Sequence, residues 1–203
     1  MESDSYLTIK AFSKGLYREK GSRFIALAYP VSGQEEIKTI LAQVRKEYHD
    51  ARHHCFAWVL GQERVNFRVN DDGEPSGTAG RPIIGQINSA CLTDILVIVV
   101  RYFGGKLLGT SGLINAYRTS AESAIRNGEI IERHVQENYE LHFPYSALND
   151  IMKLVKEEDM QHSDQIFELE CAMKVFFRRS RAEMILEKFS RIDGLEARKI
   201  NAG

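Results

Sequence analysis

The sequence has few cysteines and no long apolar run. Its 203 residues include three cysteines, Cys55, Cys91 and Cys171, which form no Cys-x-x-Cys pair. An odd number of widely separated cysteines argues against a disulfide framework and is typical of a reducing compartment. The longest apolar runs fall far short of the roughly 20 residues that a membrane span needs, and no secretory signal is visible at the N-terminus. We therefore expect a cytoplasmic protein that does not contact a membrane.

An excess of one charge is also missing. The chain has 27 Lys and Arg against 28 Asp and Glu, a net charge of −1. This balance excludes a strongly basic protein of the kind that binds DNA without specificity, although charges can still gather locally. The sequence contains no HExxH motif, no recognisable Ser-His-Asp pattern and no Gly-Lys-Ser/Thr order of a P-loop. It therefore predicts no metal and no cofactor, and it favours a protein that is not an enzyme.

Glycine is concentrated in one region, residues 70–117, which holds two loops rich in glycine and charge. Between the loops lies the most apolar run of the chain, Ile95–Val100, whose β-branched residues predict a central buried strand. A helix is expected after each loop, the first through Ala90 and the second ending at Asn127. The central strand should bring the two loops together.

The rest of the first part predicts strands and one more helix. Residues 23–29 are apolar on both faces, as in a strand buried within a sheet. Ser32 and Glu35 have the spacing of a capping box, followed by apolar residues at helical spacing up to Tyr48. Residues 64–69 alternate as in a half-exposed strand. This part is expected to be an α+β domain covering residues 1–133.

From Val135 onward the pattern predicts a second domain, residues 135–203. Strand-like alternation in residues 139–143 is followed by a helix after Pro144, a short strand near Met160, and a long strand from Phe167 to Phe177. Ser180 and Glu183 then have the spacing of a second capping box. The resulting order β-α-β-β-α-β is that of a ferredoxin-like fold.

The second loop has the chemistry of an anion site. Glycines before a helix expose backbone N–H groups, and the helix N-terminus adds partial positive charge. Nearby basic, hydroxyl and aromatic side chains extend this to a phosphate- or nucleic-acid-binding surface. The candidate residues are Arg101, Tyr102, Phe103, Gly104, Gly105, Lys106, Gly109, Thr110, Ser111 and Gly112. The alternative is that the glycines only permit a tight turn from strand to helix.

Other clusters also have two interpretations. Asp71, Asp72 and Glu74 suit a divalent cation or an acid–base pair, but acidic residues beside Gly and Pro are also common turn formers. The histidines at 49, 53 and 54 and Cys55 suggest zinc or a nucleophile, although their spacing fits neither, and Cys55 is expected to be buried. The arginines at 178, 179 and 181 either meet phosphates or face solvent.

Four segments together resemble the signature of the IMPACT/YigZ family. They are Ala51–Cys55 (ARHHC), Asp72–Gly80 (DGEPSGTAG), Val100–Gly105 (VRYFGG) and the glycines and aromatic end of Leu108–Tyr117. The second part is similar to the C-terminal domain of bacterial two-domain members of that family. Because the segments are ordered and spread along the first part, their match is more specific than a single glycine motif.

The resemblance implies an N-terminal fold like domain 2 of ribosomal protein S5 and a ferredoxin-like domain similar to the last domain of elongation factor G. From family and fold it also implies RNA or a ribosome as partner. Eukaryotic relatives are linked to translational control, but they carry a different extra domain, so their protein partner is not carried over. The second loop of the same surface would then comprise Asp72, Gly73, Glu74, Ser76, Thr78 and Arg81, with Arg52 and His53 in support.

Three functional hypotheses follow. The first is a non-enzymatic factor that associates with nucleic acid or ribosomes, with a role in translation regulation. The second is an enzyme or small-ligand site that binds phosphate through Gly104–Gly112 and uses Asp72 or Glu74 as base or metal ligand. The third is a protein–protein interaction module that uses the strand 167–177 as an edge or as a docking face. The sequence leaves the oligomeric state open.

Overall fold

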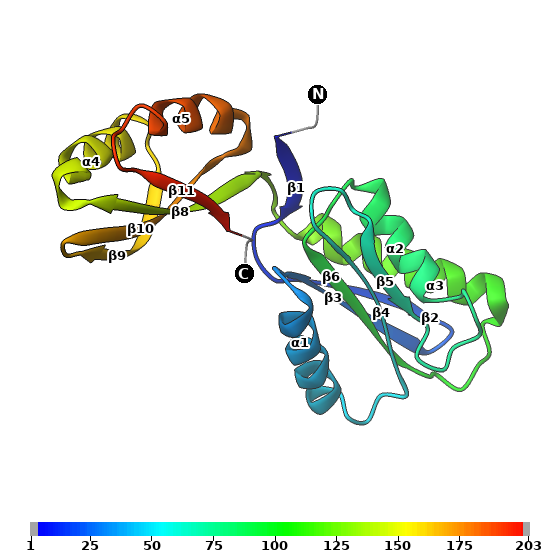
Figure 1. Cartoon of the computed structure of the whole chain (residues 1–203). Coiled ribbons are helices and arrows are strands. Elements are labelled where there is room, and N and C mark those ends of the chain that lie inside the picture. Colours follow the sequence, from blue (N-terminus) through cyan, green and yellow to red (C-terminus); the bar gives the residue numbers. More distant parts are fainter. Residues whose placement is uncertain (1–3, 201–203) are drawn as a thin grey trace. The chain divides into compact units, whose positions relative to one another are not determined.

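The structure, a computed structural model, describes residues 4–200. The chain forms two compact units, one of residues 6–133 (the N-terminal unit) and one of residues 134–200 together with residues 4–5 (the C-terminal unit). Figure 1 shows the elements of each. The expected division into independently folding domains at 133–135 stays a prediction, whereas the expected α+β fold class is confirmed by the architecture of the two units.

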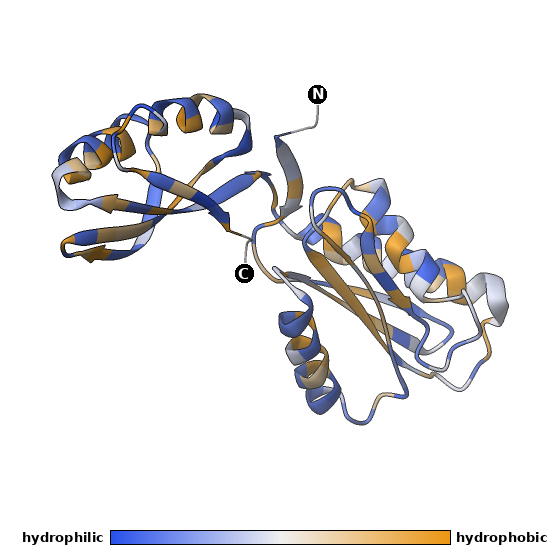
Figure 2. Ribbon diagram, viewed as in Figure 1, coloured by the Kyte–Doolittle hydropathy of each residue, from blue (hydrophilic) through white to orange (hydrophobic). Residues whose placement is uncertain are grey.

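The N-terminal unit is built on a five-stranded antiparallel sheet in the order β2-β3-β6-β4-β5. The strands are β2 (Ser13–Glu19), β3 (Ser22–Pro30), β6 (Ile95–Tyr102), β4 (His53–Leu60) and β5 (Asn66–Asn70). The central strand is β6, and its residues Ile95–Val100 are fully buried, as their composition predicts. Figure 2 shows apolar residues concentrated in the central strands.

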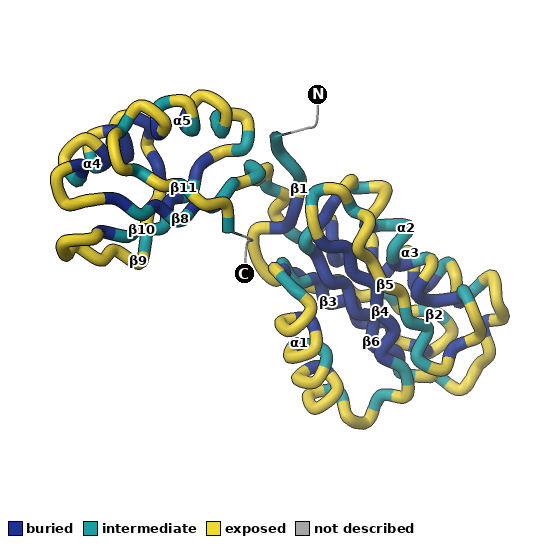
Figure 3. The backbone as a smooth tube through the Cα atoms, in the orientation of Figure 1, coloured by how far each residue is buried: buried dark blue, intermediate teal, exposed yellow. Residues whose placement is uncertain are grey.

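Helices cover both faces of this sheet. Helix α1 (Gln34–Glu47) packs on one face, over a core that includes Trp58, while α2 (Gly80–Ser89) and α3 (Gly109–Asn127) cover the other. Burial follows this layering, because the central strands are buried and the outer sides of the helices are exposed (Figure 3). A separate two-stranded sheet pairs β1 (Ser5–Ile9) with β7 (Ile130–His134).

The C-terminal unit has the ferredoxin-like order. Its elements are β8 (Gln136–Pro144), η1 (Tyr145–Ala147), α4 (Leu148–Glu157), β9 (Gln161–Phe167), β10 (Glu170–Arg178), η2 (Arg179–Arg181), α5 (Ala182–Phe189) and β11 (Glu196–Ile200). The four strands form an antiparallel sheet in the order β11-β8-β10-β9. Alternate residues of β8 and β10 pack against α4 and α5 in one core, which accounts for the alternation in the sequence.

Three local predictions are wrong. Glu35 does not close a capping box, because Ser32 donates from both N and Oγ to Glu36 instead. Ser180 lies in η2 and bonds Asp4, so it caps no helix. The strand expected from Phe167 is interrupted, since Phe167 ends β9 and a turn precedes β10. Because β10 lies between β8 and β9, it is not an edge strand, and only the docking-face form of the interaction-module hypothesis stays a prediction.

Candidate nucleic-acid interface

The two glycine-rich loops meet through a buried ion pair. Arg101, near the end of β6, donates from Nη1 to Glu74 Oε1 at 2.6 Å, and the Tyr117 hydroxyl of α3 donates to the same oxygen at 2.7 Å. Only 7% of the Arg101 side chain and 3% of the Glu74 side chain are exposed. The pair therefore joins the loop 71–79 to the sheet and to α3, and it confirms that β6 brings the loops together.

Two further polar side chains surround this pair. His53, which is paired with Arg101 across β4 and β6, directs Nδ1 to the Asp72 carbonyl oxygen at 2.9 Å and Nε2 toward Glu74 at 3.9 Å. Cys55 Sγ lies 3.3 Å from the Tyr117 hydroxyl. Burial raises the pKa of both Cys55 and Tyr117, so the thiol and the phenol stay protonated and act as hydrogen-bonding groups. The nucleophile hypothesis for Cys55 is thus disfavoured, because the reactive form is the thiolate.

The acidic residues of the first loop organise backbone. Asp71 accepts hydrogen bonds from the amides of Gly77, Ala79 and Gly80, where α2 begins, at 2.8–3.0 Å. Asp72 accepts from the His54 amide and from Arg45. No group of His, Cys, Asp and Glu in residues 4–200 is arranged to hold a metal ion. The turn-forming interpretation of these carboxylates therefore fits the geometry, and their use as a base stays a prediction.

Replacing Asp71 by alanine should lower the free energy of unfolding by about 1–2 kcal/mol at pH 7, because three amides lose their acceptor. Burial alone would raise the pKa of Asp71, but these amides and Arg81 outweigh it and hold the pKa below its ordinary value. The contribution is therefore complete above the unfolded pKa of about 3.9 and is lost as the pH falls through the native pKa.

Urea titrations at pH 7 and near pH 3 measure this effect. The emission of the single tryptophan, Trp58, reports on the N-terminal unit because its side chain is buried there. The difference between the wild type and Asp71→Ala should shrink at the lower pH. An equal difference at both pH values would contradict the role assigned to Asp71.

The glycines of the second loop serve two purposes. Gly104 lies against the β2–β3 turn with its amide donating to Ser22 Oγ at 3.1 Å, and a Cβ there would overlap the backbone of Gly21 and Ser22. Gly105 and Gly109 have φ values of +83° and +73°, which favour glycine. Gly109, Thr110, Ser111 and Gly112 form the start of α3, where no side chain caps the helix and the first turn has no acidic residue.

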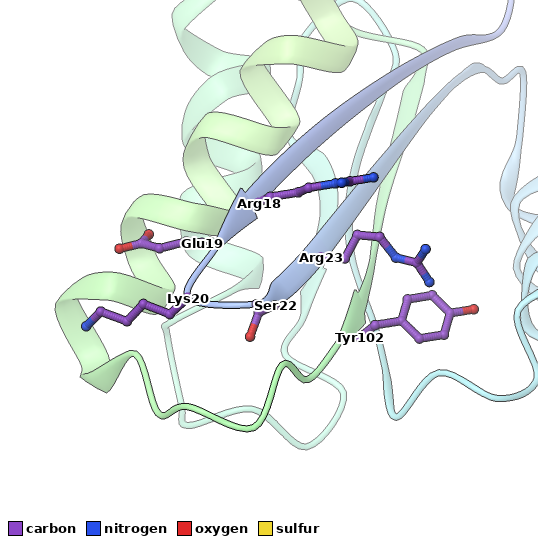
Figure 4. Close-up of a pocket in the computed structure, with 7 residues that line it drawn as sticks. Arg18, Glu19, Lys20, Ser22, Arg23 and Tyr102 are labelled. Carbon is purple, nitrogen blue, oxygen red and sulfur yellow. The ribbon is translucent and has the colours of Figure 1, made fainter.

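Exposed basic side chains gather where this loop meets the β2–β3 turn. Arg18 and Arg23 lie opposite each other on β2 and β3, and Arg23 lies opposite Tyr102 on β6. We call Arg18, Lys20, Arg23, Arg52 and Lys106 the basic cluster; all five are exposed, and none forms an ion pair with another residue of 4–200. Arg18, Arg23 and Tyr102 point the same way from the sheet, while Glu19 and Lys20 point to the opposite side (Figure 4). Glu19 accepts a hydrogen bond from the Tyr17 hydroxyl.

The sequence-based candidates therefore divide into exposed and internal residues. The exposed ones are Arg52, Gly73, Ser76, Arg81, Phe103, Gly105, Lys106, Gly109, Thr110 and Ser111. Arg101, Glu74 and Thr78 are buried, and Tyr102, Gly104, Gly112, Asp72 and His53 are partly buried. Arg101 was expected to meet phosphate, and its buried pairing with Glu74 does not favour that role. Arg18, Lys20 and Arg23 are not among the sequence-based candidates, although the density of basic residues at positions 14–23 is a sequence signal that points to them.

The remaining clusters have structural partners. His54 is buried and directs Nε2 to the Tyr48 carbonyl oxygen at 3.1 Å, on the opposite side of β4 from Cys55. In the C-terminal unit, Arg181 pairs with Glu158, which Lys188 also contacts. All three cysteines are free. These contacts leave the basic cluster as the strongest candidate surface in the described part of the chain.

Comparisons with known proteins identify the family. Residues 20–125 match the model of the Impact N-terminal domain. The chain is 39% identical to the IMPACT family member YigZ of Escherichia coli over 142 residues, which are 69% of this chain and 70% of that protein. The chain belongs to the IMPACT family. The expected family membership is thus confirmed, and the matched domain contains every residue of the basic cluster except Arg18.

One further relative and one solved structure are similar to most of the chain. The IMPACT family member YvyE of Bacillus subtilis is 34% identical over 153 residues, 75% of this chain and 70% of that protein. A crystal structure described as that of a hypothetical protein has a TM-score of 0.77 and 32% identity, over 99% of this chain and 100% of its own. The two-unit architecture is therefore shared with a solved structure.

Among residues 4–200, no helix combines the length and apolarity needed to cross a membrane.

Proposed function

We propose that this IMPACT family member is a non-enzymatic factor that binds RNA, on the ribosome or free in the cytoplasm, and acts in translation regulation. The observation that carries the proposal is the pairing of Arg18 with Arg23 on adjacent strands, where neither side chain forms a direct ion pair with another residue of 4–200. Like charges placed directly opposite each other destabilise a sheet. A pair that costs stability is best accounted for by an anionic partner that neutralises it.

The surroundings of this pair fit a polyanion. Lys20, Arg52 and Lys106 add three more exposed, unpaired positive charges, and the exposed Phe103 adds an aromatic surface. Proteins neutralise nucleic-acid phosphates with such side chains and stack aromatic rings on unpaired bases. The net charge of the chain is near neutral, so an attraction to a polyanion depends on local concentrations of positive charge such as this one. The family resemblance to proteins of translational control supports RNA as the polyanion.

The affinity for RNA should fall with salt and with removal of basic side chains. The double variant Arg18→Gln/Lys20→Gln should bind a fluorescein-labelled single-stranded RNA at least tenfold more weakly at 50 mM salt, measured by anisotropy. If both side chains contact phosphates, the slope of log affinity against log salt should become shallower by about 1.4. The free energy of unfolding should not fall, because the change relieves the repulsion between Arg18 and Arg23.

The matched control removes the same charge from the C-terminal unit. Lys153 and Lys156 lie exposed on α4, so Lys153→Gln/Lys156→Gln changes the net charge equally but leaves the basic cluster intact. Its affinity and salt slope should equal those of the wild type. The absence of binding to RNA and of cosedimentation with ribosomes at low salt would overturn the proposed function.

A further inference from the structure

The Tyr102 ring is held in a fixed position beside the β2–β3 turn. Its hydroxyl donates to Asp50 Oδ1 at 2.7 Å, and the Arg23 guanidinium lies over the ring, 4.5 Å from its centroid. Burial and the neighbouring Asp50 carboxylate raise the pKa of Tyr102 to about 12, so the phenol remains a donor. The anchored ring in turn orients the guanidinium plane of Arg23, whose side chain is exposed.

A hollow of about 480 Å³ opens next to this stack. It is lined by residues 18–23 and Tyr102 (Figure 4). Its volume lies within the range of about 300–1,000 Å³ typical of small-ligand sites, which is sufficient for one nucleoside. On one side of the hairpin its lining brings together the guanidinium groups of Arg18 and Arg23 and the Tyr102 ring, while Glu19 and Lys20 point to the other side (Figure 4). A planar group flanked by negative charges complements this combination.

Unpaired nucleotides supply both features at once. Proteins stack unpaired RNA bases on aromatic rings or on arginine guanidinium planes, whereas the bases of a duplex are already stacked on each other. An acidic peptide would neutralise the charges of the basic cluster, but its carboxylates do not stack on a guanidinium that lies over an aromatic ring. The geometry therefore favours a single strand over both a duplex and an acidic protein.

We propose that Arg23 and Tyr102 form a stacking platform for one unpaired base of single-stranded RNA, whose flanking phosphate meets Arg18, on the same side of the hairpin. This inference rests on the proposed function, because it names the form of RNA and the place of one base. Arg23 contributes its plane as well as its charge. Lysine at this position keeps the charge but cannot stack in the same way.

The experiment compares Arg23→Lys and Tyr102→Leu with the wild type by anisotropy, using a labelled single-stranded RNA of about 12 nucleotides. Loss of one base stack corresponds to a weakening of about five- to a hundredfold. Because the charge is unchanged, the salt slope of Arg23→Lys should equal that of the wild type. The same RNA annealed to its complement should bind more weakly and should not distinguish Arg23→Lys from the wild type.

Matched controls are Arg126→Lys, at the end of α3, and Tyr145→Leu, in η1 of the C-terminal unit. Both residues are exposed, and both variants should bind as the wild type does. Thermal unfolding and Trp58 emission identify any variant that is not folded, and Arg23→Lys, an exposed substitution, keeps the test decisive if Tyr102→Leu fails to fold.

Three results would overturn the platform. Arg23→Lys binding single-stranded RNA as tightly as the wild type, while Arg18→Gln/Lys20→Gln loses affinity, would leave a phosphate-binding surface without base stacking. Equal affinity for duplex and single-stranded RNA would likewise indicate binding to phosphates without base stacking. Polyglutamate competing as well as RNA, with no effect of Arg23→Lys, would assign the surface to an acidic protein. No binding of any RNA would instead remove the proposed function, and the platform with it.

Discussion

Replacing Arg101 by methionine should lower the free energy of unfolding of the N-terminal unit by about 3–5 kcal/mol. The substitution leaves the Glu74 carboxylate buried without its counter-ion, since only 3% of that side chain is exposed. Of the two hydrogen bonds to Glu74 Oε1, only that from the Tyr117 hydroxyl would then remain. His53 Nε2 lies 3.9 Å from the same oxygen. Most of the loss is the cost of an uncompensated buried charge rather than the value of the ion pair itself.

Urea unfolding followed by Trp58 emission measures this loss, and two further variants identify its cause. Glu74→Leu/Arg101→Met removes both charges, so it should recover most of the stability that Arg101→Met loses. Arg45→Met breaks the pair with Asp72, in which the Arg45 side chain is 48% exposed, and should cost less than about 1 kcal/mol. A loss below 1 kcal/mol for Arg101→Met would show that the buried pair does not hold the two loops together.

Replacing Gly104 by alanine should cost about 3 kcal/mol or prevent folding of the N-terminal unit. An added Cβ would overlap the backbone of Gly21 and Ser22, and backbone on both sides cannot yield as a flexible side chain can. The β2–β3 turn would have to separate from the loop after β6. Since that turn carries Arg18, Lys20 and Arg23, the affinity for RNA should fall together with the stability.

The control for this variant is another glycine with free space around it. Gly85 lies within α2, and a Cβ there meets nothing within 4 Å. Gly85→Ala should therefore stabilise the protein by about 0.5–1 kcal/mol, since alanine is the better helix former. Thermal unfolding of both variants by circular dichroism provides the comparison. A stable Gly104→Ala would mean that loop and turn separate without cost.

The sequence predicted the ferredoxin-like unit well because the central strands β8 and β10 alternate in burial, and alternation reports directly on a sheet with one covered face. It misplaced the boundary at Phe167, where the apolar side chain ends one strand and does not begin the next. The central strand β6 was equally clear. A strand that is buried on both faces, however, does not indicate to which face Arg101 and Tyr102 point. For this reason the sequence could not show which of the two residues belongs to an exposed site.

The interpretation of the second-loop glycines as an anion site was limited in a similar way, because the sequence does not show which distant residues the glycines contact. The need for glycine at Gly104 comes from its contact with Gly21, more than 80 positions earlier, which no local pattern reports. Likewise, Glu74 resembles a turn former until its partner Arg101 is known. Whether a candidate residue is internal or exposed therefore depends on its contacts with residues far away in the sequence, and its residue type alone does not indicate this.

The pairing of β1 with β7 has a consequence for synthesis of the chain. Ile9 and Thr8 are fully buried, and the Lys10 amide donates to the Glu129 carbonyl oxygen at 2.8 Å. On a translating ribosome, residues 5–9 must therefore wait for more than a hundred further residues before their strand partner emerges. Contacts of such high sequence separation form late and slowly. Residues 5–9 can therefore pair only after β7 has been synthesised.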